Sequence, residues 1–238
     1  MDPRAFLLSS LIVAIGAALQ GAVGFGLGLF AVPLLLLFAP ELVPGPLLAA
    51  SMVLTMFLAH HERGAIAWRD LGWALLGRAV GIAAAAALLA TVSQTALGLW
   101  SGVLVLVAVG LSASGLHVPP APRSLLAAGA LAGLLGTAVS IGGPPIALLY
   151  QREPGPRLRG TLAAFFLIGV AMSLVGLGLA DHFGLVELRL AAYLVPGILL
   201  GFLVSRRASR ILDRGYTRSA ILAISALSSL VVILRAFW

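Results

Sequence analysis

Residues 18–33 read ALQGAVGFGLGLFAVP, and residues 130–145 read ALAGLLGTAVSIGGPP. Both stretches open with AL-x-G-x-x-G, contain further glycines and close on a proline. Each stretch lies inside an otherwise apolar run, where glycine and proline weaken or end a helix. One chain therefore carries the same helix break twice, and the surroundings of the two breaks decide the fold.

Those surroundings are predicted to be a lipid bilayer. Hydrophobic residues make up 61% of the 238 residues and charged residues 10%, whereas about a quarter of an ordinary soluble domain is charged. Several runs are apolar on every face and approach the ~20 residues that cross a bilayer. We predict an all-α polytopic membrane protein with eight membrane segments, at residues 5–38, 45–59, 71–91, 95–115, 124–150, 160–180, 187–205 and 216–236.

Several classes of protein are excluded or disfavoured by the composition. The net charge of +7 comes from 15 basic residues that are all arginine and cluster between apolar segments, which is typical of membrane topology and not of nucleic-acid binding. The chain has no cysteine, which excludes disulfides and thiolate sites. His60, His61 and Glu62 lack the second histidine of a zinc motif, so we expect neither a metal site nor a cofactor. Residues 1–22 resemble a signal peptide, but the apolar run continues into the first break, so we expect no cleavage.

The two breaks belong to a longer internal repeat. We predict two homologous halves, residues 1–116 and 124–238, joined by a connecting loop at 117–123 within a single integral membrane domain. Gly77 with Gly81, and Gly197 with Gly201, are small residues four apart and predict close helix packing. The landmarks are Gly21, Gly24 and Pro33, which recur 112 residues later, and Gly64, Trp73, Gly77 and Gly81, which recur as Gly184, Tyr193, Gly197 and Gly201 120 residues later.

The arginine-rich loops of the two halves do not occupy equivalent positions in the repeat. The basic loop of the first half is 60–70, and those of the second half are 150–160 and 205–218, while their repeat equivalents carry few basic residues or none. An inverted repeat places all three loops on one side, as the positive-inside rule prefers. Inversion needs an odd number of crossings per half, so we expect segments 5–38 and 124–150 to be broken or re-entrant hairpins. Eight plain crossings are the alternative.

Paired breaks predict a binding site near the middle of the membrane. A break leaves backbone polar groups without helical partners, which lipid does not tolerate unless the break is buried or lines a wet cavity. Helix N-termini at such a break favour anions. None of the eight acidic residues lies in the middle of a segment, which argues against cation transport. The polar residues near the breaks are Gln20, Ser51, Thr55, Thr137, Ser140 and Ser173.

Two interpretations stay open for the polar side chains. A lone serine or threonine in a membrane helix often bonds back to its own helix and binds nothing else. Arg78 lies about two turns into its segment, so its side chain either snorkels to the basic interface or faces the substrate path.

The two glycine motifs also resemble a known family. GAVGFGLGLFAVPLL at 21–35 and GTAVSIGGPPIALLY at 136–150 are similar to the repeated signature of the TauE/SafE sulfite exporter family. Here Leu27 and Leu29 flank a glycine where the family's first motif usually has consecutive glycines. The resemblance implies a carrier of two similar halves for small sulfur-containing or organic anions such as sulfite, sulfoacetate or other sulfonates. By motif match it implies a substrate site at Gly24, Gly26, Gly28, Gly142, Gly143 and Pro144.

We therefore expect a non-enzymatic secondary transporter, an exporter of small anions that works by alternating access around the two breaks. A passive anion channel is the alternative, followed by an intramembrane enzyme or scaffold. The expected partners are a small anionic substrate and membrane lipid, while a coupling proton or ion and a homo-oligomer stay open. The lysine-free, arginine-rich composition and the resemblance favour the inner membrane of a bacterial cell as the location of this multi-pass protein.

Overall fold

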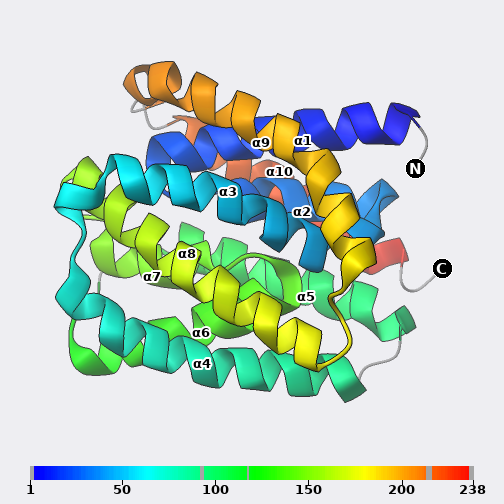
Figure 1. Ribbon diagram of the computed structural model, residues 1–238, viewed down its shortest axis with the longest axis horizontal. Coiled ribbons are helices and arrows are strands. Elements are labelled where there is room, and N and C mark those ends of the chain that lie inside the picture. The colour runs from blue at the N-terminus through cyan, green and yellow to red at the C-terminus, as the bar shows by residue number, and fades with distance from the viewer. Residues whose placement is uncertain (1–2, 92–93, 117, 213–215, 236–238) are drawn as a thin grey trace.

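The computed structural model of the protein is a bundle of helices that lie roughly along one common direction (Figure 1). It describes residues 3–91, 94–116, 118–212 and 216–235, and the side chains within 5–91, 99–116, 118–205 and 222–234. The arginines of the predicted basic loop 205–218, which are Arg206, Arg207, Arg210, Arg214 and Arg218, lie outside the described side chains.

The described residues form helices and no strand. Five of these helices are long and apolar enough to cross a membrane, so the protein is a multi-pass membrane protein, while the count of eight segments stays a prediction. The helices are α1 (Pro3–Val23), α2 (Leu27–Phe38), η1 (Pro40–Leu42), α3 (Gly45–His61), η2 (Arg63–Ala65), α4 (Trp68–Thr91), α5 (Gln94–Ala113), α6 (Pro122–Val139), α7 (Gly143–Tyr150), α8 (Gly155–Leu179), α9 (Leu185–Leu212) and α10 (Tyr216–Arg235).

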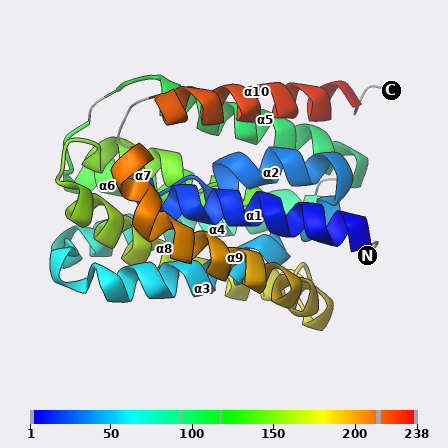
Figure 2. The ribbon, with the colours of Figure 1, turned by 90° about the horizontal axis from the view of Figure 1, so that it is seen from above.

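The helix breaks predicted from the two glycine stretches are present. The first divides segment 5–38 into α1 and α2, and the second divides segment 124–150 into α6 and α7. After each break the chain folds back on the helix it has just left: a Cβ on Gly16 would lie 3.2 Å from the Leu27 Cα, and one on Gly142 would lie 2.9 Å from the Ala132 carbonyl. Figure 2 shows α2 beside α1.

Glycines bring two pairs of helices into backbone contact. A Cβ on Gly77 or Gly81 of α4 would overlap the Leu126 or Ala130 carbonyl of α6. The corresponding contact between α9 and α1 is made by Gly197 and Gly201, which face the Ser10 and Ala14 carbonyls. The prediction that these glycines are close-packing faces is confirmed, and the two contacts tie each half of the chain to the other.

Interactions between loops distinguish the two ends of the bundle. At one end the segment between α3 and α4 meets the start of α8: Arg159 donates to the Glu62 carboxylate at 2.8 and 2.9 Å, and the Ala67 amide donates to Thr161 Oγ1 at 3.0 Å. At the other end, the start of α3 meets the α8–α9 connection, where a Cβ on Gly45 would lie 2.9 Å from Phe183. Loops 60–70 and 150–160 therefore lie at the same end.

Candidate functional site

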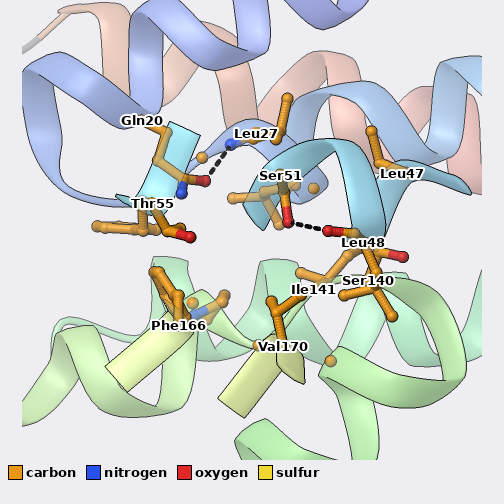
Figure 3. A pocket seen from close by; sticks show the side chains of 18 of the residues that line it. Gln20, Leu27, Leu47, Leu48, Ser51, Thr55, Ser140, Ile141, Phe166 and Val170 are labelled. Carbon is orange, nitrogen blue, oxygen red and sulfur yellow. Dashed lines mark hydrogen bonds between the residues drawn. The ribbon is translucent and has the colours of Figure 1, made fainter. Parts of the chain in front are cut away.

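A cavity lies between the two helix breaks. Its volume is about 40 Å³, which exceeds the space that a single water molecule needs. Figure 3 shows polar side chains of α1 and α3 on one side and Phe166 and Val170 of α8 on the other. The lining residues are Gln20, Phe25, Gly26, Leu27, Gly28, Leu29, Leu47, Leu48, Ser51, Thr55, Arg78, Gly136, Ser140, Ile141, Gly142, Gly143, Pro144, Phe166 and Val170.

The two breaks touch each other at this cavity. A Cβ on Gly28 would overlap the carbonyl of Ser140, and one on Gly143 would lie 2.9 Å from the Phe25 Cβ. The turn of the first break needs glycine, because Gly26 has a φ of 134°, a conformation that a side chain rarely permits. Ser140 ends α6 in the left-handed region, and its hydroxyl donates to the Pro44 carbonyl at 2.9 Å. Each break therefore supports the other.

The polar side chains of the first half use their hydrogen bonds differently. Ser51 and Thr55 donate to the carbonyls of Leu48 and Met52 on their own helix, as the bonding-back interpretation expected. Gln20 instead accepts from the Leu27 amide at 3.3 Å, which satisfies one amide group at the start of α2. Its Nε2 group has no partner among the described residues and is available to the cavity as a donor.

Arg78 supplies the charge of the cavity. Its side chain is only 1% exposed, so it lies inside the protein and does not snorkel to the interface. Nη2 donates to Ser173 Oγ at 3.3 Å, and the guanidinium lies 4.8 Å from the centre of the Phe165 ring. Nε and Nη1 have no hydrogen-bond partner among the described residues. A buried cation thus belongs to the lining of the cavity, and two of its donor groups have no partner among the described residues.

Glycines of the second break and of α8 surround this guanidinium. A Cβ on Gly142 would lie 3.4 Å from Nη1, one on Gly136 would lie 3.3 Å from Nη2, and one on Gly169 would overlap Nε. Glycine at these three positions leaves the space that the guanidinium occupies. In the predicted repeat Gly197 corresponds to Gly77, so Ile198 corresponds to Arg78. Ile198 is fully buried and uncharged.

Two of the predicted site residues do not line the cavity. Thr137 lies behind Arg78, where its hydroxyl donates to Ser173 Oγ at 2.8 Å, and Ser173 in turn donates to the Gly169 carbonyl. Gly24 packs against the backbone of Arg159, because a Cβ on Gly24 would lie 3.3 Å from the Arg159 Cα. The other nine, which are Gln20, Gly26, Gly28, Ser51, Arg78, Ser140, Gly142, Gly143 and Pro144, come together at the cavity.

The apolar part of the lining was missed by sequence reasoning. Phe166 and Val170 are one turn apart on α8 and form one side of the cavity, but α8 is apolar all round. Its periodicity therefore does not indicate which face is turned inward. Phe25 lies between two predicted glycines, and this position within the motif was the one available signal.

No carboxylate belongs to the lining of the cavity among the described residues. Two described acidic side chains are paired elsewhere, Glu62 with Arg159 and Glu153 with Arg157. The described cavity therefore has one uncompensated positive charge, backbone at two helix starts and a free amide donor, all of which favour an anion.

Comparison with known proteins agrees with this arrangement. The family model described as Sulfite exporter TauE/SafE matches residues 9–232, which include both breaks and every residue that lines the cavity. No match to the chain was found among the curated proteins or among the solved structures. Since nearly the whole chain is matched, the protein belongs to the TauE/SafE sulfite exporter family of membrane transporters.

Proposed function

We propose that the protein is a secondary transporter that exports small anions, such as sulfite or sulfonates, by alternating access around its two helix breaks. The observation that carries the proposal is the unpaired guanidinium of Arg78 in a cavity without a described carboxylate. A buried charge is costly unless a partner of opposite sign accompanies it. A small anion is the partner that this cavity lacks.

In the proposed complex, the guanidinium of Arg78 binds the anion. The Nε2 group of Gln20 donates from the opposite side, and backbone amides at the starts of α2 and α7 add further donors. Ser173 and Phe165 hold the guanidinium in place. The glycines at 26, 28, 142 and 143 allow the anion to approach the backbone closely.

The proposal includes an inverted repeat, which the helix contacts support. In the repeat, α1 corresponds to α6, α2 to α7 and α4 to α9. The contact between α1 and α9 therefore corresponds to the contact between α6 and α4, and the contact between α1 and α2 corresponds to the contact between α6 and α7. Two of the five pairs of corresponding helices, α3 with α8 and α5 with α10, are also in contact. The common end of loops 60–70 and 150–160 also favours inversion over eight plain crossings. Each half would then rock against the other around the cavity.

The proposal is tested by charge displacement on supported membranes that carry the purified protein. Pulses of sulfite, sulfate, thiosulfate, taurine, sulfoacetate, short carboxylates and Na⁺ are applied with and without a pH gradient, and radiolabelled sulfite detects movement without net charge. We expect a saturable response to a sulfur-containing anion. A response that rises without saturation would favour the anion channel, and a response to Na⁺ alone would contradict an anion site.

The matched variants are Gly142→Leu and Gly110→Leu. The side chain at 142 would enter the space beside Arg78, so we expect transport to be lost while membrane insertion continues. A Cβ on Gly110 would meet nothing within 4 Å, so leucine there should leave transport unchanged. Normal flux in Gly142→Leu would remove the cavity from the transport path.

A further inference from the structure

We infer that the protein is an obligatory anion exchanger, in which the site crosses between the two sides of the membrane only when an anion occupies it. This inference rests on the proposed function and deepens it, because it names how one flux is coupled to another. It follows from the charge balance of the empty cavity.

The empty cavity has a net charge that nothing described inside the protein balances. The guanidinium of Arg78 contacts a hydroxyl, Ser173 Oγ, and an aromatic ring, Phe165. Both contacts are electrically neutral, although the ring face attracts a cation weakly. Nε and Nη1 are buried and have no hydrogen-bond partner among the described residues, and the side chain is 1% exposed.

No acidic side chain among the described residues lines the cavity with Arg78, and Asp70 of the same helix accepts a hydrogen bond from Tyr150 at 2.8 Å. Glu62 is held by Arg159 at 2.8 Å, and Glu153 by Arg157 at 3.3 Å, both at the arginine-rich end of the bundle. The acidic residues of the opposite end, Asp181 and Glu187, lie in the α8–α9 connection and the first turn of α9. A buried charge without a partner is costly, so an empty site that crosses the membrane needs a counter-charge. The described lining of this cavity contains no carboxylate that could provide it.

The cost of this charge depends on the stage of the transport cycle. While the cavity is open to one side, water hydrates the guanidinium and screens it. Alternating access requires an intermediate that is closed to both sides, and closure removes most of that water. In this intermediate an unpaired cation is strongly disfavoured, whereas a cation paired with a monovalent anion is neutral and hydrogen-bonded. The barrier for the empty site therefore exceeds that for the loaded site.

The position of Arg78 keeps its guanidinium inside the protein in the closed intermediate. It projects from α4 of the first half and is enclosed by Gly136 of α6, Gly142 before α7 and Gly169 of α8 in the second half. Any rocking of one half against the other must carry the guanidinium through the closed intermediate. Its charge is thus part of every crossing, and an anion must accompany it in both directions.

The test compares exchange with net uptake in proteoliposomes. Radiolabelled sulfite is supplied outside vesicles that contain either unlabelled sulfite or impermeant buffer, with equal potassium on both sides and valinomycin to hold the membrane potential at zero. We expect initial uptake to be at least about tenfold faster into the sulfite-loaded vesicles, which corresponds to ~1.4 kcal/mol between the two barriers. The wild-type protein alone decides this comparison.

Variants at position 78 test whether the arginine causes the coupling. Arg78→Lys keeps the charge and should keep the preference for loaded vesicles. Arg78→Met removes both the group that binds the anion and the charge that impedes the empty site. Fast exchange should therefore be lost, and uptake into sulfite-loaded vesicles should fall to the rate seen with buffer-filled vesicles, with Arg78→Gln as a second neutral variant. Arg157→Gln, at a half-exposed arginine outside the cavity, is the control and should behave as wild type.

Each outcome has a distinct meaning. Equal saturable uptake into both kinds of vesicle would overturn obligatory exchange and leave the transporter function standing. Absence of saturable sulfite flux in both would contradict the proposed function itself. A wild-type ratio in Arg78→Met and Arg78→Gln would show that the coupling has another origin than this charge.

Discussion

At the scale of single residues, the site is a short chain of hydrogen bonds that ends in an unsatisfied cation. Thr137 donates to Ser173, which donates to the Gly169 carbonyl and accepts from Arg78 Nη2. Ser173 is fully buried and is the one hydroxyl that fixes the guanidinium among the described residues. Removal of this hydroxyl leaves a buried hydroxyl and a buried N–H group with fewer partners and lets the cation turn.

We therefore predict that Ser173→Ala weakens anion affinity. A hydrogen bond to a charged group contributes about 1.5–3 kcal/mol, so the concentration for half-maximal flux should rise about tenfold or more. The measurement is the concentration dependence of the charge displacement evoked by sulfite. Ser229→Ala is the matched control, because Ser229 is equally buried and donates within α10 to the Ser225 carbonyl, outside the cavity lining. An unchanged half-saturation in Ser173→Ala would show that Ser173 does not orient Arg78.

At the scale of helices, glycine has two separate structural roles. At the breaks it permits the backbone turn at Gly26 and the crossing of Gly28 over the Ser140 carbonyl. Within α4 and α9 it removes side chains so that two backbones touch, which is how membrane helices gain packing when lipid is as apolar as their side chains. The position of a glycine within its helix therefore decides which of these it serves.

The role of glycine at helix contacts leads to a prediction about the stability of the protein. Gly81→Ala places a methyl group onto the Ala130 carbonyl of α6, whereas Gly72→Ala on the same helix meets nothing within 4 Å. Overpacking typically costs about 1–3 kcal/mol, so Gly81→Ala should unfold at lower temperature in detergent. Gly72→Ala should match or exceed wild type, since alanine is the better helix former. Equal melting temperatures for the two variants would mean that α4 and α6 separate easily.

The sequence was informative about these elements where the pattern was discontinuous. Uniform apolar runs are interrupted at two kinds of place, and both kinds were predicted. These are the breaks at 24–26 and 140–142 and the glycine faces at 77, 81, 197 and 201. Sequence alone did not assign inward faces, because apolar periodicity is uninformative in helices that contact lipid on one side and protein on the other. Phe166 and Val170 were missed for that reason, and the choice between two positions for Arg78 needed the three-dimensional contacts.

At the scale of the whole molecule, the two ends of the bundle differ in charge. Loops 60–70 and 150–160 meet at one end through Glu62 and Arg159, while the start of α3 and the α8–α9 connection meet at the other. From the positive-inside rule we expect the arginine-rich end to face the cytoplasm. The absence of cysteine from the chain makes this orientation directly measurable.

We predict that single cysteines at Arg63, Arg157 and Arg210 are all labelled from the cytoplasmic side by a membrane-impermeant maleimide, and that a cysteine at Asp181 is labelled from the opposite side. The measurement compares intact cells with inside-out vesicles, and the cysteine-free parent chain provides the background. Labelling of positions 63 and 157 from opposite sides would end the inverted-repeat interpretation and return the protein to eight plain crossings.

The lone arginine of the cavity has one more consequence. In a perfectly symmetric inverted repeat, each half takes the conformation of the other when the site changes sides. The inward-open and outward-open states then have equal free energy. Arg78 has Ile198 at the corresponding place, so the halves are not interchangeable. If the protein is such a transporter, the two resting orientations are expected to differ in free energy and in their affinity for the anion. A single side chain would then decide on which side of the membrane the empty site waits, while the direction of net flux would still follow the gradients.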